Sequence, residues 1–215
     1  MAAVRVHLVG HDWGSVQGWH LVTGPRYRGV RSFTSISGPC LDHIAGWLGR
    51  RVKARQWADI AALWKAPLYT GVLQVPGLGP LLCRLGAVDL VVAAAITLFE
   101  QPERPEWPER RNRRPDGPHA RVSAASVRMY AANLLPRLVR GDHGGTDVPV
   151  QVLTPTSDVF VPPVSQHDPH PEVTTARIER VPGGHWAPAC NPIAIAERIA
   201  DWIATWQPIE RETTS

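Results

Sequence analysis

The stretch VRVHLVGHDWGS, residues 4–15, decides how the rest of the chain is interpreted. Its apolar, β-branched first part predicts a buried parallel strand over residues 4–9 that ends at a glycine. A helix is predicted over residues 15–23, because a Gly-Pro pair follows and stops it. A single carboxylate, that of Asp12, therefore stands at a tight turn between a strand and a helix.

Two glycines suit such a turn. Gly10 and Gly14 lie two positions before and two positions after Asp12, where small residues let the strand and the helix approach closely. The turn presents its side chain at the carboxyl edge of the sheet and at a helix N-terminus, where backbone N–H groups favour an anion. We therefore predict that Asp12 is a nucleophile; the alternative is that it only caps the following helix. The serine form of the turn, G-x-S-x-G, does not occur, which disfavours serine acyl transfer.

Composition limits the classes of protein that need to be considered. The chain has 215 residues, 44% apolar and 20% charged, which is typical of a globular protein. No apolar run approaches the roughly 18 residues that span a bilayer, and no secretory leader is recognised, so a cytoplasmic protein is expected.

Three isolated cysteines favour buried thiols, and the histidines lack ligand spacing, so neither a metal nor a cofactor is expected. An arginine cluster at residues 110–114 lies among prolines and is interpreted as a solvated loop, not a nucleic-acid site.

The remaining pattern divides the chain into two parts of an α/β core separated by a helical insertion. Strands are predicted over residues 29–37, 148–153 and 176–181, and a final helix over residues 192–207. Helical periodicity without a convincing strand covers residues 56–64, 78–85, 88–99 and 123–139. The predicted domains are a first core part at 1–40, a helical cap at 41–147 and a second core part at 148–215.

Two more polar residues follow predicted strands. Asp158 lies in a loop after the strand at residues 148–153, and His185 lies in a loop after the strand at 176–181. Each residue taken alone is equally well an ordinary turn aspartate or loop histidine. Together with Asp12 they appear in the chain order nucleophile, acid, histidine, which predicts a triad at one edge of the sheet.

The motifs GHDWG (residues 10–14), SDVFVPP (157–163) and PGGHW (182–186) resemble the epoxide-hydrolase branch of the α/β-hydrolase superfamily. That branch shares an aspartate nucleophile with haloalkane dehalogenases. The chain is similar in particular to the hydrolase domain that precedes a short-chain dehydrogenase domain in some bifunctional proteins. The resemblance implies a partial α/β-hydrolase fold with a helical cap insertion.

The same resemblance implies roles for further residues. Two cap tyrosines would hold the epoxide oxygen: Tyr69, a few residues before Gln74, and Tyr130 in VRMYAAN. The backbone N–H of Trp13 would be an oxyanion donor. The implied reaction opens an epoxide to a vicinal diol through an ester on Asp12, without a cofactor. A small apolar substrate suits the tryptophans of the cap, which are Trp47, Trp57, Trp64 and Trp107.

The chain departs from the family pattern before Gly10. The family places further strands and a His-Gly-x-Pro loop, which supplies a second oxyanion donor, ahead of the nucleophile strand, whereas nine residues precede Gly10 here. We therefore expect an N-terminally truncated sheet whose nucleophile strand is an exposed edge. A start that lies upstream, a gene remnant or a homodimer that covers this edge would each account for the departure. No nucleic-acid partner and no transmembrane segment are expected. The alternative functions are a haloalkane dehalogenase-type hydrolase and an inactive, truncated α/β-hydrolase fragment.

Overall fold

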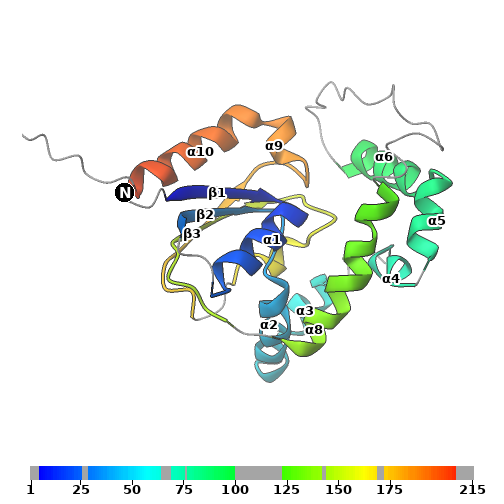
Figure 1. The fold of residues 1–215 in the computed structure, drawn as a ribbon, viewed down its shortest axis with the longest axis horizontal. Helices are drawn as coiled ribbons and strands as arrows, with labels where there is room; N and C mark the ends of the chain where they lie inside the picture. Colours follow the sequence, from blue (N-terminus) through cyan, green and yellow to red (C-terminus); the bar gives the residue numbers. More distant parts are fainter. Residues whose placement is uncertain are drawn as a thin grey trace, which may run out of the picture.

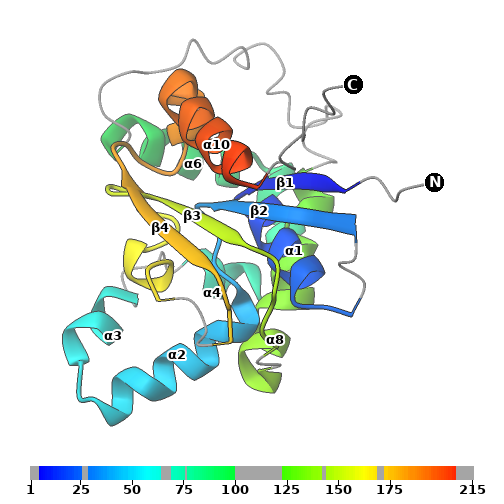
Figure 2. The same ribbon diagram turned by 90° about the vertical axis from the view of Figure 1, so that its left-hand side faces the viewer.

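A parallel sheet forms the centre of the molecule. The computed structural model describes residues 5–25, 29–63, 69–75, 77–99, 123–141, 144–168 and 172–206. All strand pairs of the sheet are parallel, in the order β1-β2-β3-β4 (Figure 2). The strands are β1 (Val6–His11), β2 (Val30–Ile36), β3 (Val150–Pro155) and β4 (Ala176–Val181). The α/β class and the four predicted strands are confirmed; β4 has the predicted ends, and the ends of the other three strands differ by one or two residues.

Helices cover both faces of this sheet (Figure 1). Helix α1 (Trp13–Val22) packs on one face, and α9 (Ala187–Cys190) and α10 (Pro192–Thr205) lie on the other. The alternation of side chains along a strand explains this arrangement. In β3, Val150 and Val152 join the apolar cluster under α1, while Leu153 joins the cluster under α10.

A helical segment connects β2 to β3. Its elements are α2 (Leu41–Lys53), α3 (Trp57–Leu63), α4 (Tyr69–Leu73), α5 (Leu78–Arg84), α6 (Ala87–Phe99), the π-helical turn η3 (Tyr130–Leu134) and α8 (Leu135–Arg140). No strand occurs among the described residues of this segment. None of the described helices combines the length and the apolar character needed to cross a membrane.

The structure differs from the predicted helices in two places. Helix α2 lies outside the predictions, although Leu41, Ile44 and Trp47 are buried at helical spacing along it. The helix predicted over residues 123–139 is not continuous, because the π-helical turn η3 interrupts it immediately before Pro136 in α8.

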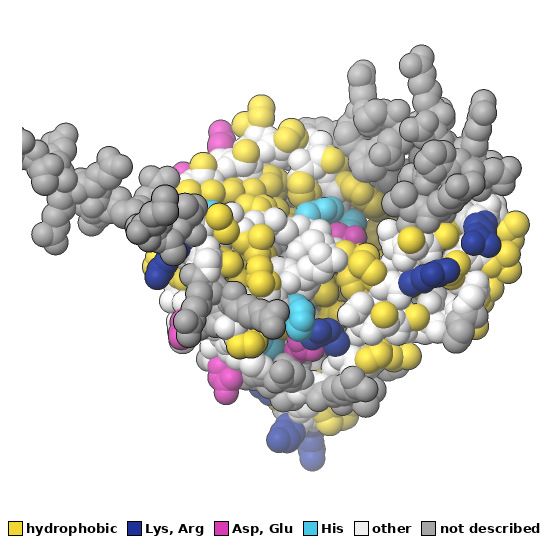
Figure 3. Space-filling model, viewed as in Figure 1, with side chains coloured by type: hydrophobic (Ala, Val, Ile, Leu, Met, Phe, Trp, Pro, Cys, Tyr) yellow, Lys and Arg dark blue, Asp and Glu magenta, His cyan; other side chains and the backbone are white. Residues whose placement is uncertain are grey.

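Strand β1 is an edge of the described sheet. Its strand pairing within the described residues is with β2 alone. Val6 is 51% exposed and Val9 is 43% exposed, so the prediction of a buried strand is wrong, whereas the expected exposed edge is present. Figure 3 shows hydrophobic side chains gathered on the face where β1 lies beside α10. One of the two edges of the described sheet is therefore the strand that leads into Asp12.

Candidate active site

Asp12 occupies the turn between β1 and α1 in a strained backbone conformation. Its φ of 52° and ψ of −123° lie outside the regions that residues other than glycine usually adopt. The turn is held on both sides, because the Asp12 N–H donates to the carbonyl of Ile36 (3.0 Å) and the Asp12 carbonyl accepts from Ser15 N–H (2.9 Å). The carboxylate makes no capping hydrogen bond to α1, and the side chain is 42% exposed. The capping alternative is therefore not supported.

The glycines around the turn differ in their importance. A Cβ on Gly10 would lie 2.5 Å from the carbonyl oxygen of Gly14, so β1 and α1 approach too closely there for any side chain. A Cβ on Gly14 meets nothing within 4 Å, so the predicted steric need for that glycine is wrong. Gly38, after β2, is the second position without room, because a Cβ there would collide with the carbonyl oxygen of Asp12. No local signal predicts this contact, because Gly38-Pro39 is a pair typical of the end of a strand.

Asp158 and His185 lie together in loops at the carboxyl end of the sheet. Asp158 precedes the short helix η4 (Pro163–Ser165), and its Oδ1 accepts hydrogen bonds from the N–H groups of Phe160 (2.9 Å) and Val161 (2.8 Å). Both carboxylate oxygens lie 3.2 Å from Nδ1 of His185. Because a carboxylate only accepts, Nδ1 carries the proton of this contact, and Nε2 is the ring nitrogen turned toward Asp12.

His185 faces Asp12. Its Nε2 lies 3.7 Å from Oδ1 of Asp12, longer than a hydrogen bond. The imidazole is almost completely buried, and its ring packs against those of Phe160 and Trp186 at centroid distances of 5.3 and 4.9 Å. The structure thus brings together the three residues of the predicted triad, although their roles stay predictions.

One contact in this cluster has no counterpart in the sequence analysis. His11, which precedes Asp12, places its Nε2 2.8 Å from the backbone carbonyl oxygen of His185. Burial lowers the pKa of His11 from its ordinary value of 6.5. A histidine without ligand spacing gave no reason to single it out, because this contact joins residues that are distant in sequence.

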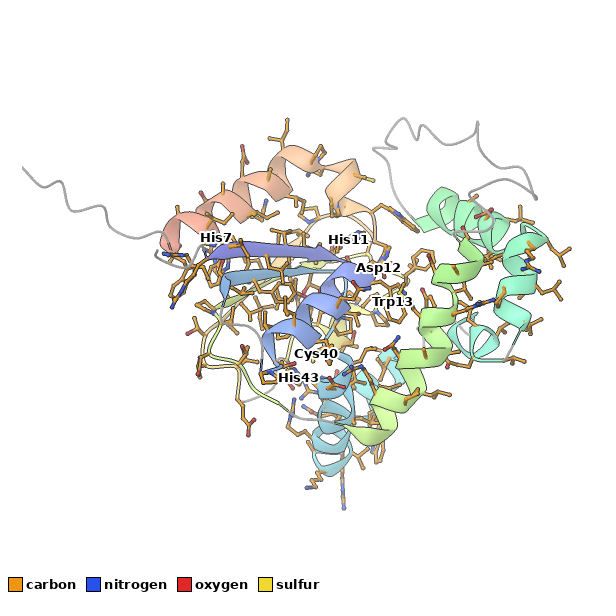
Figure 4. The ribbon with its side chains drawn as sticks, in the orientation of Figure 1. His7, His11, Asp12, Trp13, Cys40 and His43 are labelled. Atoms are coloured by element: carbon orange, nitrogen blue, oxygen red, sulfur yellow. The ribbon has the colours of Figure 1, made fainter. Side chains whose placement is uncertain are left out.

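The helical segment approaches the same turn. Trp13 begins α1, and no group among the described residues accepts a hydrogen bond from its N–H. The Trp13 ring packs edge-on against that of Tyr130 at 4.8 Å, and Figure 4 shows Asp12 and Trp13 at the end of β1 that faces these helices. Gln74, immediately after α4, donates to the carbonyl of Tyr130 (3.1 Å). Tyr69 is the first residue of α4, but its side chain lies outside the described part of the chain.

Other predicted features have mixed outcomes. Trp47 is buried and Trp57 is 60% exposed, while Trp64 and Trp107 lie outside the described residues. All three cysteines are free thiols; Cys40 and Cys83 are buried as predicted, Cys190 only partly, and burial raises the pKa of Cys40 to about 12. Among the described residues, no group of His, Cys, Asp or Glu side chains is arranged to hold a metal ion.

Comparison with curated proteins finds one kind of relative. No protein-family model matches the chain. It is 29% identical to "Probable oxidoreductase EphD" of Mycobacterium tuberculosis over an alignment of 215 residues, which covers 92% of this chain and 33% of the relative. EphD of Mycobacterium bovis gives the same values. The chain thus spans about a third of the length of the curated relatives it matches.

Solved structures show the fold. An epoxide hydrolase of the α/β-hydrolase superfamily from metagenomes of hot environments superposes with a TM-score of 0.65 at 18% identity, covering 94% of this chain and 68% of the other. A mutant of the haloalkane dehalogenase DatA from Agrobacterium tumefaciens gives a TM-score of 0.59 at 19% identity, with coverages of 94% and 68%. This chain therefore has a partial α/β-hydrolase fold.

Proposed function

We propose that the protein opens epoxides to vicinal diols through an ester formed on Asp12. The spatial arrangement of the Asp12, His185 and Asp158 side chains is the observation that supports the proposal. The His185 ring stands between two carboxylates, with Nε2 3.7 Å from Asp12 and Nδ1 3.2 Å from Asp158. The Asp12 side chain is 42% exposed while its two partners are buried, so the nucleophile is the member of the group that a substrate can reach.

In the first step, an oxygen of Asp12 attacks an epoxide carbon and displaces the ring oxygen, which leaves an ester between enzyme and substrate. The bonding pair of the broken C–O bond goes to the epoxide oxygen, which takes a proton from a tyrosine hydroxyl. Tyr130 is supported in this role by its ring contact with Trp13, directly after the nucleophile. Tyr69 is proposed as the second donor on the family resemblance, and the hydrogen bond from Gln74 to the carbonyl of Tyr130 attaches the segment that follows α4 to the start of η3.

In the second step, Nε2 of His185 takes a proton from water as that water attacks the carbonyl carbon of the ester. Asp158 stabilises the imidazolium that forms, because it already accepts a hydrogen bond from Nδ1. The N–H of Trp13 at the start of α1 would stabilise the negative oxygen of the tetrahedral intermediate. Its collapse breaks the bond between the carbonyl carbon and the substrate oxygen, and the imidazolium returns its proton to that oxygen of the diol. The second proton of the attacking water, left on the carboxyl of Asp12, returns to the tyrosinate, so the Asp12 carboxylate and the tyrosine hydroxyl are both regenerated.

A haloalkane dehalogenase-type reaction is the second candidate, favoured by the likeness to DatA and by Trp13 beside the nucleophile. Its first step would also form an ester on Asp12, but a halide would leave, and this ion needs N–H donors. The tyrosines have no role in that scheme. EphD is described as a probable oxidoreductase, but that description belongs to a longer protein, of which this chain covers 33%.

The trapped ester tests the proposal. His185→Gln removes the base of the second step, so exposure to styrene oxide should add one substrate mass to the intact protein. The adduct should be absent from the double variant that also carries Asp12→Asn. Wild-type protein should release diol, and His7→Gln, a histidine at the far end of β1, should match wild type. An unchanged mass of the His185→Gln protein, with the same epoxide consumed by a control hydrolase, would refute the proposal. Bromide release from 1,2-dibromoethane without diol formation from the epoxide would favour the dehalogenase reaction instead.

A further inference from the structure

We infer that His11 is a positioning residue that holds the loop of His185 at its working distance from Asp12. The inference rests on the proposed function, because it concerns the second of the two proposed steps. It is carried by the hydrogen bond from Nε2 of His11 to the backbone carbonyl of His185, 2.8 Å long.

The two ends of this hydrogen bond differ in how firmly the backbone holds them. His11 is the last residue of β1 and pairs with Ile36 of β2, so its backbone is part of the sheet. His185 lies in the loop between β4 and α9, two residues after Gly183, whose φ of 115° marks an irregular turn. The bond therefore attaches a loop to the strand that carries the nucleophile, across 174 residues of sequence.

The chemistry of the bond fixes the state of His11. A carbonyl oxygen only accepts, so Nε2 of His11 must carry a proton. Burial lowers the pKa of this imidazole from its ordinary value of 6.5, which favours the neutral ring. The His11 ring lies 5.1 Å from that of His185, which becomes positive when it takes a proton from water. A neutral donor can hold the loop without repelling this charge.

His7 provides an internal comparison. It lies four residues before His11 on the same face of β1, at the far end of the strand (Figure 4). Its Nδ1 is 2.7 Å from the hydroxyl of Ser32 in β2, so this hydrogen bond joins two strands and does not involve the loop of His185. The same substitution is therefore made at both positions. Removing His7 tests the general effect of losing a histidine from β1, whereas removing His11 also removes the contact with His185.

The inference predicts an effect on one step alone. Asp12 attacks the epoxide without help from His185, so ester formation should be retained when the loop shifts. Ester hydrolysis needs the imidazole at the attacking water, where a displacement of about 1 Å can cost 10²-fold in rate. A general loss of folded protein slows both steps together and leaves no ester to detect.

The experiment measures both steps in single turnovers with styrene oxide, by intact mass at quenched times. We expect His11→Leu to form the ester at a rate within about threefold of wild type and to hydrolyse it about 10²-fold more slowly. His11→Gln, whose amide N–H reaches the same carbonyl, should restore hydrolysis to within about tenfold, and His7→Leu should match wild type. His11→Asn, whose shorter amide does not reach, repeats the test if the leucine variant is insoluble.

Three results would overturn the inference: hydrolysis at the wild-type rate in His11→Leu, equal slowing of both steps, or no rescue by glutamine. The variant His185→Gln, measured in the same experiment, shows whether the inference about His11 fails by itself or fails because the proposed function is wrong. If His185→Gln forms no ester, the proposed function fails and the inference falls with it. If it accumulates ester while His11→Leu and His11→Asn do not, the proposed function stands and the role of His11 is refuted.

Discussion

Replacing Gly10 with alanine tests how closely β1 and α1 must approach for Asp12 to be presented at the turn. The added Cβ would lie 2.5 Å from the carbonyl oxygen of Gly14 and 2.7 Å from Cα of Ser15. The first distance is 0.9 Å below the 3.4 Å at which ordinary contact begins. Both neighbours are backbone atoms of the first turn of α1, so the helix itself has to move.

This displacement sets the size of the expected effects. Overpacking of a well-packed site costs about 1–3 kcal/mol, and Gly10→Ala should lie at the upper end because no flexible side chain can give way. A helix shifted by about 1 Å also moves Asp12 away from Nε2 of His185. We therefore expect diol formation to fall about 10²-fold in the protein that remains folded.

Gly14→Ala is the matched control. Its Cβ would meet nothing within 4 Å, and Gly14 lies in the first turn of α1, where alanine is the better helix former by up to about 1 kcal/mol. Urea unfolding gives the free energy for both variants, and diol formation from styrene oxide gives the activity. The reasoning is refuted if Gly10→Ala is as stable and as active as wild type, or if the two variants lose equal stability.

Three further predictions follow from the same geometry. Asp158→Asn should slow ester hydrolysis by about 10⁴-fold and make the ester accumulate, because an amide does not stabilise the imidazolium of His185; decay within tenfold of wild type speaks against this. The free energy of unfolding should fall as pH drops below 6.5, because burial holds the pKa of folded His11 lower and the unfolded chain takes up the proton first. The slope is at most about 1.4 kcal/mol per pH unit for this group, and parallel curves for wild type and His11→Gln would contradict it. If a second copy covers the edge of β1, the wild-type protein should sediment as a dimer, and Val9→Lys should dissociate it. Val52→Lys, at a similarly exposed valine on α2, should leave the dimer intact. A wild-type protein that sediments as a monomer would contradict this expectation.

Local signals in the sequence were sufficient for the turn and the strands. The apolar run before Gly10 and the loops that carry Asp158 and His185 each have a pattern of their own. Because all strands of the sheet are parallel, their carboxyl ends meet at one edge, and this rule alone brings Asp12, Asp158 and His185 together. The amphipathic pattern of α2 is equally local, so this helix could also have been predicted from the sequence.

Packing between distant residues could not be predicted in the same way. Whether a Cβ would fit at Gly14 or would collide at Gly38 depends on where α1 begins relative to β2, and the residues around these two glycines do not encode that position. The exposure of β1 depends on what lies beside the strand, whereas its composition only shows that it is apolar. The contact of His11 with His185 depends on the path of a loop at the other end of the chain.

The source of the oxygen in the product tests the central claim most directly. Asp12 is proposed to supply an oxygen to the substrate, and water to attack the carbonyl carbon of the resulting ester. A single turnover of styrene oxide in ¹⁸O-labelled water, with enzyme in excess, should therefore give an unlabelled diol and a peptide containing Asp12 that has gained one ¹⁸O. A diol that carries ¹⁸O after this first turnover, with Asp12 unlabelled, would show that water attacks the epoxide directly and would contradict the account.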